Sequence, residues 1–417
     1  MDIKSYIEDI AKRAKSAYSK SVSLSGSIKN RALYKIAELL DKNRDVIKKE
    51  NLIDMDNGKK RGLSNAMLDR LLLNDKRIDG MIESLKSVIS LPDPVGEVYD
   101  EKRLNNGLLI GKQRVPLGVI GMIYESRPNV TIEASSLTIK SSNAIILRGG
   151  SEAINSNKIL GNIIREALDK SNIDPDMVNI IETTDREAVL HLIRMVGSVD
   201  VIIPRGGEEL INFVSQNSLI PIIKHDKGVC SLFINYDADK NMAEQIAVNA
   251  KVQRPGVCNA IENLYIHKDY PYKKDLIEVL MKHNVKIKGY KEAADIVGEI
   301  ERFEDLNEFT VEYLDLILSV KIVDSVDEAI YMINTYGSGH SDAIVSNNYK
   351  DMMKFKDGVL SAAVYLNAST RFTDGFEFGM GGEIGISTNK LHARGPVALR
   401  ELTTYKYVII GNGQIRE

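Results

Sequence analysis

Apolar residues recur at intervals of three and four through the first part of the chain, between runs of lysine, aspartate and glutamate. Leu39, Leu40 and Ile47 show this spacing clearly. Because one turn of an α-helix takes about 3.6 residues, the spacing places such side chains on one face. The pattern predicts that residues 2–95 are almost wholly helical. Leu91-Pro92-Asp93-Pro94 is expected to end this block, since proline cannot continue a helix.

The segment after the helical block has the composition of a β-hairpin. Asn105-Asn106-Gly107 supplies residues that favour a tight turn, and Leu108-Leu109-Ile110 is rich in strand-forming side chains. The sequence therefore predicts a hairpin over Leu104–Val115.

From Gly118 onward the pattern changes to short apolar runs that alternate with helical segments. Predicted strands are Val119–Ile123, Ala144–Leu147, Val178–Ile181, Val199–Ile203 and Pro221–Ile223, and predicted helices are Val130–Lys140, 152–168, 186–196 and 207–216. Short, almost entirely apolar strands separated by helices are typical of a parallel sheet that is buried on both faces. This part of the chain is predicted to be an α/β domain.

A second series of the same kind begins at Gly228. Its predicted strands are 229–235, Ala260–Ile266, Val311–Val323, Ala343–Val345 and Ala362–Leu366, and its predicted helices are 240–250, 271–283 and 327–335. We therefore predict two α/β domains with a hinge near Lys224–Gly228.

Composition narrows the class of protein. The 417 residues carry 55 Lys and Arg against 58 Asp and Glu, a net charge of −3, so the chain has no overall attraction for nucleic acid or anionic lipid. Two cysteines cannot form a disulfide framework, and they fit a reducing compartment. The start, Met1-Asp2-Ile3-Lys4, lacks the apolar core of a signal peptide, and the longest apolar stretch, about Pro116 to Tyr124, is too short to span a membrane. We expect a soluble cytoplasmic protein that binds neither membrane nor nucleic acid.

Two glycine pairs are candidates for nucleotide binding. Neither a G-x-G-x-x-G fingerprint nor a P-loop motif is present. However, Arg148-Gly149-Gly150-Ser151 and Arg205-Gly206-Gly207 each follow a predicted strand and precede a predicted helix. Backbone N–H groups and an arginine at a helix N-terminus suit a phosphate. Each segment could equally be an ordinary connection between a strand and a helix.

Cys258 is the candidate nucleophile. It lies in the loop Gln253-Arg254-Pro255-Gly256-Val257-Cys258-Asn259, with an arginine four residues before it, and a nearby positive charge favours the reactive thiolate. A loop cysteine can also be purely structural. Cys230 alternates within an apolar strand and is predicted to be a small core residue. The histidines and cysteines show no metal-ligand spacing, so no metal site is expected.

Eight segments, spread in order over nearly the whole chain, carry a resemblance to a known family. They are Tyr124–Thr131, Ile146–Ala153, Val201–Gly207, Gln253–Ala260, Glu312–Asp315, Tyr336–Ile344, Asn367–Phe372 and Gly379–Gly385. Together they resemble the gamma-glutamyl phosphate reductases, a branch of the aldehyde dehydrogenase superfamily. The resemblance implies a Rossmann-like cofactor domain without the glycine fingerprint, an α/β catalytic domain and a β-hairpin arm for oligomerisation.

The resemblance also implies a division of the chain. The expected cofactor domain covers residues 1–226, with 366–396 returning to it, and the expected catalytic domain covers 227–365. The expected oligomerisation arm consists of 104–115 and 397–417, with Tyr405–Ile410 as a strand that returns to the hairpin. A homo-oligomer follows from such an arm.

The reaction implied by the resemblance is the NADPH-dependent reduction of L-glutamyl 5-phosphate to glutamate 5-semialdehyde and phosphate, the second step of proline biosynthesis from glutamate. The Cys258 thiolate would attack the acyl phosphate and form a thioester. The N–H of Cys258 and the side chain of Asn129 would stabilise the oxyanion.

Substrate and cofactor contacts are likewise implied by the resemblance. Arg127, Arg254 and Arg371 are candidates to hold the phosphate and the α-carboxylate of the substrate, since a guanidinium group matches both. Glu312 would bind the nicotinamide ribose. The remaining cofactor contacts are expected at the two glycine pairs, from Arg148, Gly149, Gly150, Ser151, Arg205, Gly206 and Gly207.

Two alternatives compete with this reading. A hydrolytic semialdehyde dehydrogenase of the same superfamily needs a general base, a glutamate in a Glu-Leu-Gly-Gly-Lys segment at the domain junction. The corresponding segment here, His225–Cys230, has no such glutamate, which favours transfer to phosphate over hydrolysis. A scaffold that keeps the fold without catalysis is disfavoured because Cys258, Glu312 and both glycine pairs are present.

Overall fold

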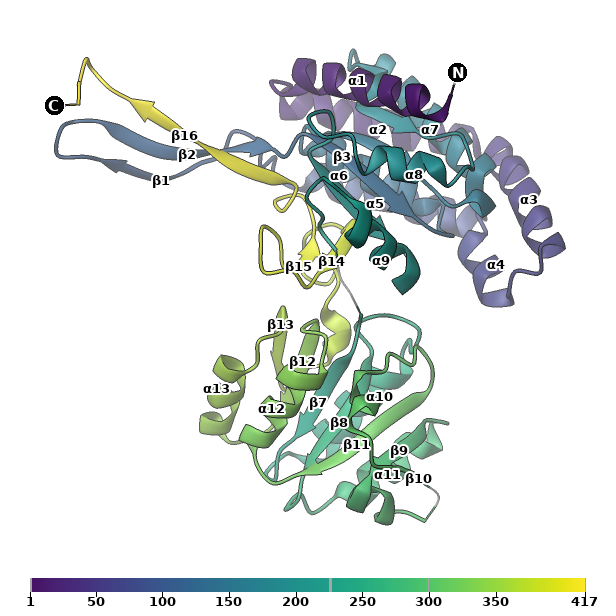
Figure 1. Ribbon diagram of the computed structural model, residues 1–417, viewed down its shortest axis with the longest axis vertical. Helices are drawn as coiled ribbons and strands as arrows, with labels where there is room; N and C mark the ends of the chain where they lie inside the picture. Colours follow the sequence, from purple (N-terminus) through teal and green to yellow (C-terminus); the bar gives the residue numbers. More distant parts are fainter. Residues whose placement is uncertain (1, 225–226, 299, 417) are drawn as a thin grey trace. The chain divides into compact units, whose positions relative to one another are not determined.

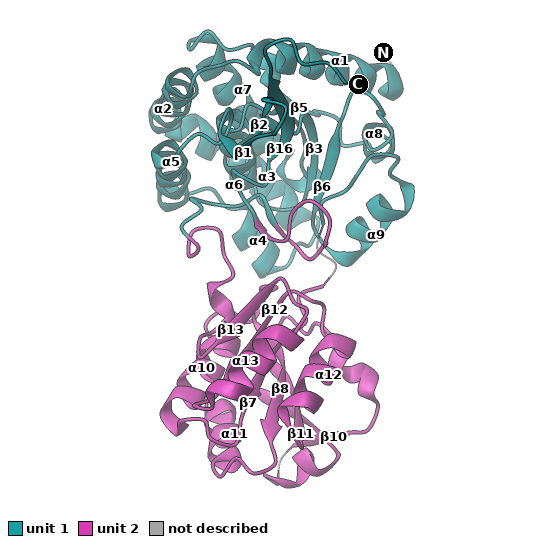
Figure 2. Cartoon of the chain, turned by 90° about the vertical axis from the view of Figure 1, so that its left-hand side faces the viewer, with its two compact units in different colours: residues 1–224, 379–385, 397–417 teal, residues 225–378, 386–396 magenta. Residues whose placement is uncertain are grey.

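The computed structural model describes residues 2–224, 227–298 and 300–416. The chain forms two compact units (Figure 2). Unit 1 comprises Met1–Lys224, Gly379–Gly385 and Val397–Glu417, and unit 2 comprises His225–Phe378 and Ile386–Pro396. Both contain a parallel sheet with helices on its two faces, so the predicted pair of α/β domains is confirmed.

The sheet of unit 1 has the strand order β5-β4-β3-β6, and all its neighbours are parallel. Its elements are β3 (Val119–Tyr124), β4 (Ala144–Arg148), β5 (Val178–Ile180) and β6 (Val201–Arg205), with α6 (Asn129–Lys140), α7 (Ile154–Asp169), α8 (Glu187–Leu192) and α9 (Glu208–Asn217) between or after them. Every residue of β3 is buried, as expected for a central strand covered on both faces. The predicted strand at Pro221–Ile223 is reduced to an isolated bridge between Ile202 and Ile222.

The amino-terminal block is helical, as predicted. It forms α1 (Ile3–Ser21), α2 (Gly26–Lys42), α3 (Arg44–Lys60), α4 (Asn65–Leu71) and α5 (Asp75–Ser90). Helices α2 and α3 pack on α7, and α5 packs on α6, whereas α1 contacts β4 and α8 (Figure 1). Side chains cap several of these helices; Asp2, for example, accepts a hydrogen bond from the Ser5 N–H.

A three-stranded antiparallel arm projects from the body of unit 1 (Figure 1). Its strands are β1 (Val98–Arg103), β2 (Leu109–Pro116) and β16 (Thr403–Ile410), in the order β1-β2-β16. The turn at Asn105-Asn106-Gly107 is where the sequence placed it, and Gly107 has φ +89°. The hairpin is longer than predicted, because β1 lies before Leu104. Its sequence, VYDEKR, is mostly exposed and shows no apolar alternation. The expected return of Tyr405–Ile410 to β2 is confirmed.

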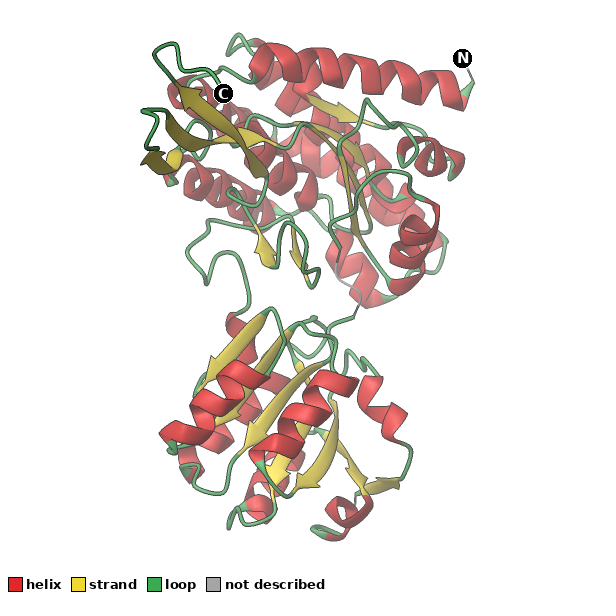
Figure 3. Cartoon of the chain, turned by 60° about the vertical axis from the view of Figure 1, so that its left-hand side comes forward, coloured by secondary structure: helices red, strands yellow, loops and turns green. Residues whose placement is uncertain are grey.

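The sheet of unit 2 is parallel throughout, in the order β10-β9-β11-β8-β7-β12-β13. Its elements are β7 (Cys230–Ile234), α10 (Lys240–Val252), β8 (Ile261–His267), α11 (Lys273–Lys282), β9 (Lys286–Tyr290), β10 (Glu301–Phe303), β11 (Ile317–Val323), α12 (Val326–Tyr336), β12 (Ser341–Val345), α13 (Tyr349–Gly358) and β13 (Ala363–Leu366). Two apolar cores lie on opposite faces, one under α10 and α11 and the other under α12 and α13 (Figure 3).

Several elements of unit 2 differ from the predictions. Strands β9 and β10 and helix α13 were not predicted, because their sequences are highly charged and α13 fully buries only Phe355. The strand predicted over Val311–Val323 begins only at Ile317, since Leu314 has a left-handed backbone with φ +54° and cannot belong to a strand.

The boundary between the units also differs from the expected division. Only Gly379–Gly385 of the segment 366–396 groups with unit 1, whereas the rest groups with unit 2. The side chain of Asn259 holds the start of this segment in unit 2, through hydrogen bonds to the carbonyl oxygens of Arg371 (3.3 Å) and Thr373 (2.9 Å). The smaller elements are β14 (Gly385–Ser387) paired with β15 (Gly395–Val397), and the 3-10 turns Ser151–Ala153, Pro175–Met177, Lys291–Asp295, Leu306–Thr310 and Thr370–Phe372.

Candidate active site

Cys258 lies in the loop between α10 and β8 and is half-buried. The loop packs against Gly228: a Cβ built on this glycine would lie 2.3 Å from the carbonyl oxygen of Cys258 and 2.5 Å from its Cβ. Only glycine fits so close to the cysteine without displacing it. From the other side, the Cys230 thiol donates a hydrogen bond to the carbonyl oxygen of Cys258 at 3.1 Å. The nucleophile candidate is therefore fixed by its neighbours.

Cys230 is a core residue, as predicted. It lies on β7, is fully buried and belongs to the apolar core under α10 and α11. Burial raises the pKa of its thiol well above the usual value, and the negative charge of Asp342 adds to the effect. A thiol of this kind stays protonated and is a poor nucleophile.

Asn259 joins the cysteine loop to the segment that carries Arg371. Besides its side-chain bonds to the carbonyls of Arg371 and Thr373, its own carbonyl accepts a hydrogen bond from Thr370 Oγ1 at 2.7 Å. This clamp brings Arg371, distant in sequence, next to Cys258. Asn259 belongs to the cysteine loop, but its role as a clamp was not predicted from the sequence.

The two arginine candidates of unit 2 differ in environment. Arg371 is half-buried, and its Nε donates to Gln253 Oε1 at 2.9 Å. Burial lowers the pKa of Arg371, and the positive charge of Arg254 acts in the same direction while Cys258 opposes it. Arg254 itself is exposed. These influences show that Arg254, Arg371 and Cys258 share one electrostatic neighbourhood.

Glu312 also lies close to the cysteine loop. Its Oε1 accepts a hydrogen bond from the N–H of Gly228 at 3.0 Å, and Gly228 is the residue in contact with Cys258. Two residues later, Leu314 lies against the loop, since a Cβ on Gly256 would be 3.5 Å from its carbonyl oxygen. Unit 2 thus gathers Cys258, Arg254, Arg371 and Glu312.

A buried polar chain lies behind Cys258 and was not predicted. The Cys230 Sγ is 3.6 Å from Nδ1 of His340, which is 2.8 Å from Ser341 Oγ. Ser341 Oγ is 2.6 Å from Thr373 Oγ1, and Thr373 Oγ1 is in turn 2.6 Å from the Tyr365 hydroxyl oxygen. His340, for which the sequence predicts no definite role, is completely buried. His225 and Asp226, in the junction segment His225–Cys230, lie outside the described residues.

In unit 1, the first glycine pair has the geometry of a ligand-binding turn. Arg148 ends β4 and donates to the carbonyl oxygens of Gly149 (3.0 Å) and Thr184 (3.2 Å). Its Nε is buried and has no hydrogen-bond partner among the described residues. A Cβ on Gly149 would lie 2.0 Å from Asn157 Nδ2, so a larger residue there would have to displace the buried Asn157 side chain. A buried donor that lacks a partner calls for an oxygen ligand, and a nucleotide cofactor can provide one.

The second glycine pair is held by an acidic side chain. The N–H of Gly207 donates to Glu125 Oε2 at 3.0 Å, and α9 begins with Glu208 and Glu209. Arg205 provides a positive charge, 3.9 Å from the carboxylate of Glu383. Because the N–H is already bonded and carboxylates surround it, this turn suits a phosphate less well than the first one does.

The remaining candidates of unit 1 follow β3. Arg127 is half-buried, and Asn129 begins α6, where its Nδ2 donates to Glu133 Oε1 at 2.8 Å. Between β3 and Arg127, Ser126 has a left-handed backbone with φ +51°, and both its N–H (2.6 Å) and its Oγ (2.9 Å) donate to Glu152 Oε1. Ser126 and the adjoining Glu125 therefore connect the end of β3 to the two glycine turns. Sequence reasoning missed both, and a non-glycine residue with positive φ leaves no signal in a single sequence.

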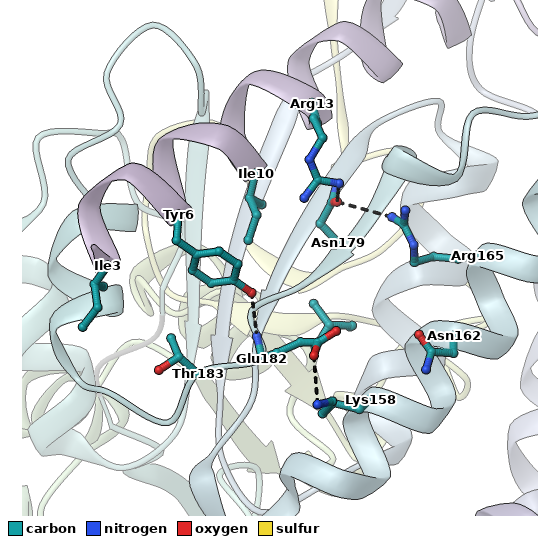
Figure 4. A pocket seen from close by; sticks show the side chains of 11 residues that line it. Ile3, Tyr6, Ile10, Arg13, Lys158, Asn162, Arg165, Asn179, Glu182 and Thr183 are labelled. Carbon is teal, nitrogen blue, oxygen red and sulfur yellow. Dashed lines mark hydrogen bonds and ion pairs between the residues drawn. The ribbon is translucent and has the colours of Figure 1, made fainter. Parts of the chain in front are cut away.

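The structure also contains a pocket that none of these residues lines. It has a volume of about 630 Å³ and lies beside the edge strand β5 (Figure 4). Its lining residues are Ile3, Tyr6, Ile10, Arg13, Lys158, Asn162, Arg165, Asn179, Ile180, Glu182 and Thr183.

Acidic partners compensate the cations of this pocket. Asp176 lies 2.6 Å from Arg13 and 2.9 Å from Arg165, and Glu182 lies 2.9 Å from Lys158. With its charges balanced in this way, the pocket offers no candidate for the chemistry described above. Among the described residues, no cluster of three or more potential metal ligands occurs, and none of the helices is long and apolar enough to cross a membrane.

Comparison with known proteins gives one consistent result. The model of the aldehyde dehydrogenase family matches residues 3–297. The gamma-glutamyl phosphate reductase of Aquifex aeolicus is 53% identical over 421 residues, which cover 99% of this chain and 97% of that protein. The enzyme of the same name from Clostridium tetani is 47% identical, with full coverage of both chains.

Solved structures agree with the sequence relatives. The crystal structure of gamma-glutamyl phosphate reductase from Thermotoga maritima superimposes with a TM-score of 0.96 at 46% identity, covering 99% of this chain and 100% of that one. An engineered glycolyl-CoA reductase with bound NADP⁺ has the same fold, with a TM-score of 0.70 at 16% identity and coverage of 97% and 96%.

Proposed function

The chain belongs to the aldehyde dehydrogenase family and, within it, to the gamma-glutamyl phosphate reductases, and we propose that it reduces L-glutamyl 5-phosphate to L-glutamate 5-semialdehyde and phosphate with NADPH. Such a reaction is the second step of proline biosynthesis from glutamate. The observation that carries the proposal is the full-length identity of about half to reductases of this name, together with a half-buried Cys258 beside two arginines. A reducing biosynthetic enzyme of this kind fits the cytoplasmic location expected from the sequence.

Cys258 is the proposed nucleophile. Its thiolate attacks the carbonyl carbon of the acyl phosphate, the C–O bond to phosphate breaks, and phosphate leaves with the bonding electrons. The products of this step are a thioester on Cys258 and inorganic phosphate. Bound NADPH would supply the hydride that reduces the thioester, and the hemithioacetal anion left on Cys258 would collapse to the aldehyde and regenerate the thiolate.

The chain's own groups would stabilise the charges that develop. The backbone N–H of Cys258 is the proposed oxyanion donor. Asn129 is the second proposed donor, and its amide would have to exchange its present bond to Glu133 for one to the substrate. Arg254 and Arg371 are proposed to hold the phosphate and the α-carboxylate, with Arg127 as a further candidate from unit 1.

The cofactor contacts are proposed on both units. In unit 1, the orphan Nε of Arg148 would bind an oxygen of the adenosine moiety, beside Gly149, Gly150 and Ser151. The turn of Arg205, Gly206 and Gly207 would contribute further contacts if the Gly207 N–H exchanged its hydrogen bond to Glu125 for one to the cofactor. In unit 2, Glu312 would bind the nicotinamide ribose. We therefore propose cofactor binding chiefly for unit 1 and catalysis for unit 2.

The experiment that tests this function runs the reaction backwards. Purified enzyme receives glutamate semialdehyde and NADP⁺, and NADPH formation is followed with and without phosphate. The proposal predicts a burst of at most one NADPH per chain without phosphate and continuous turnover when phosphate is added. Continuous turnover without phosphate would instead identify a hydrolytic dehydrogenase, and no NADPH in either case would exclude both.

We further propose that the arm of β1, β2 and β16 joins copies of the chain into a homo-oligomer. Three side chains at every second position of β16 lie on one face of the ribbon and are largely exposed: Tyr405 (46%), Tyr407 (58%) and Ile409 (54%). An exposed ribbon with an apolar face and open strand edges is a surface that a second copy of the chain can cover. Deleting Asn105–Lys112 should give monomers in sedimentation velocity; an unchanged oligomer would count against the arm.

A further inference from the structure

A buried ion pair lies directly beneath the proposed site in unit 2. Lys251, in the last turn of α10, and Glu262, on β8, approach to 2.5 Å between Nζ and Oε2, and both side chains are completely buried. The proposed chemistry uses neither residue. Burial raises the pKa of Glu262 to about 7, although Lys251 opposes the shift. Burial likewise lowers the pKa of Lys251.

Such a pair is expensive to bury. Two charges removed from water lose hydration that their mutual attraction only partly returns, and apolar residues of similar volume often stabilise a core equally well. Stability alone therefore gives little reason for a lysine and a glutamate at these positions. What the pair provides, and apolar residues could not, is a hydrogen-bond acceptor in the core.

That acceptor has a specific partner. Glu262 Oε1 accepts a hydrogen bond from the backbone N–H of Leu314 at 3.2 Å. Leu314 has φ +54°, a left-handed conformation that costs a leucine free energy and persists only where neighbours impose it. Its side chain is 46% exposed and so cannot be the anchor.

The strained residue belongs to a turn that carries Glu312. Within this turn, the Tyr313 hydroxyl is fixed by Glu308 and Ser319, each at 2.7 Å, and the Glu312 carboxylate accepts from the Gly228 N–H. The negative charge of Glu312 also contributes to the raised pKa of Glu262, and Asp315 acts on Lys251. The turn from Glu312 to Asp315 thus lies next to the ion pair and is hydrogen-bonded to it through the Leu314 N–H.

We infer that the Lys251–Glu262 pair is a positioning element for the cofactor: through the Leu314 N–H it fixes the turn that presents Glu312 to the nicotinamide ribose. The inference rests on the proposed function, because it takes Glu312 as a cofactor ligand. Lys251 holds the Glu262 side chain in place, and Glu262 accepts the hydrogen bond that fixes the backbone of the turn. Neither residue touches the cofactor.

Two double variants separate positioning from packing. K251Q/E262Q removes both charges but keeps an acceptor for the Leu314 N–H, since one amide can accept from it while donating to the other. K251M/E262M removes the charges and the acceptor together, at similar volume. The first variant should bind NADPH within about twofold of the wild type. The second should bind at least about tenfold more weakly, equivalent to about 1.4 kcal/mol.

Cofactor fluorescence gives the dissociation constants, and thermal unfolding of both variants controls for stability. Equal NADPH affinity of the two doubles would overturn the inference. A wild type that binds no NADPH would instead overturn the proposed function, so the two failures are distinguishable.

Amide hydrogen exchange of the wild-type protein provides a readout that needs no variant. The Leu314 N–H lies outside any helix or strand, yet the inference predicts strong protection without cofactor. In K251M/E262M this amide should exchange at least about tenfold faster. If both doubles fail to fold, the wild-type measurement decides: a Leu314 amide that exchanges as fast as an exposed loop amide overturns the inference.

Discussion

The two cysteines lie in neighbouring segments of one unit, yet their surroundings differ in every respect that governs thiol chemistry. Cys258 is half-buried in a loop, beside Arg254 and Arg371. Cys230 is fully buried on β7 among apolar side chains, and burial raises its pKa. A hydrogen bond from the Cys230 thiol to the Cys258 carbonyl nevertheless connects them.

Under the proposed function, this difference gives two identical side chains two different tasks. A nucleophile needs access to substrate and positive charge nearby, whereas a support needs a fixed position and no reactivity. Cys230 and Gly228 contact the backbone of Cys258 from two sides, so the proposed nucleophile lies on a closely held loop. The predictions below test whether reactivity and support are really separated in this way.

The largest effect is expected from exchanging the nucleophile itself. Cys258→Ser should reduce phosphate-dependent NADPH formation at least about a thousandfold, because a serine hydroxyl ionises far less readily than a thiol. Cys230→Ala, the matched control, should keep most of the activity and lower the free energy of unfolding by roughly 1 kcal/mol. Steady-state rates and denaturant titration check both. Similar losses of activity in the two variants would end the distinction between the cysteines.

The next largest effect is expected from adding one methyl group at Gly228, the residue that packs against Cys258. Gly228→Ala would place a Cβ within 2.5 Å of three atoms of Cys258, two of them backbone, so the loop must move. A displacement of about 1 Å at a reacting centre can cost about a hundredfold in rate, and we expect kcat to fall by that order. Gly256→Ala is the control, since its nearest neighbour would be 3.5 Å away. Wild-type kcat for Gly228→Ala would contradict the proposed close support.

The arginines that distinguish Cys258 from Cys230 should act on substrate affinity. Arg371→Ala should raise KM for the semialdehyde about tenfold or more, the effect of losing a hydrogen bond to a charged group. Arg254→Ala should lower kcat as well as raise KM for phosphate, because its charge would neutralise the leaving group. Arg302→Ala, at an exposed arginine paired with Asp295, is the control. Unchanged KM values for both substrates in both variants would place the clamp elsewhere.

A smaller but direct contrast concerns alkylation. Because burial raises the pKa of Cys230, its thiol stays protonated in the folded state while an unfolded cysteine ionises near its ordinary pKa. Between about pH 7 and 9, iodoacetamide should label only Cys258 in native protein and both cysteines in denaturant. Because the pKa of Cys230 is higher in the folded state than in the unfolded state, the ionisation of this thiol lowers the free energy of unfolding as the pH rises above the ordinary pKa of cysteine. Peptide mass spectrometry locates the label, and native labelling of Cys230 would refute its burial.

Much of the fold was predictable because each buried strand leaves a clear trace. Strands such as Val119–Tyr124 and Cys230–Ile234 are covered on both faces and are almost entirely apolar. Strand β1 could not be found in this way, since a solvated ribbon selects charged residues. The same reason explains why α13, which fully buries only Phe355, was missed.

The sequence was enough to propose Cys258 as the nucleophile, but not to identify the residues that surround and hold it. Cys258 stands out by its Pro-Gly loop and by resemblance. A single sequence does not reveal the roles of Ser126, Asn259 and the Lys251–Glu262 pair. These roles depend on backbone conformation and on partners that are distant along the chain. Positive φ at Ser126 and Leu314, in particular, has no signature in residue type.

The most direct test of the account locates the acyl group that the reaction leaves on the enzyme. The protein is incubated with glutamate semialdehyde and NADP⁺ in the absence of phosphate, quenched in acid and digested for peptide mass spectrometry. The account predicts one glutamyl thioester per chain, on the peptide that contains Cys258, and its loss when phosphate is added before the quench. An adduct on Cys230, or NADPH formation without any adduct on Cys258, would contradict it.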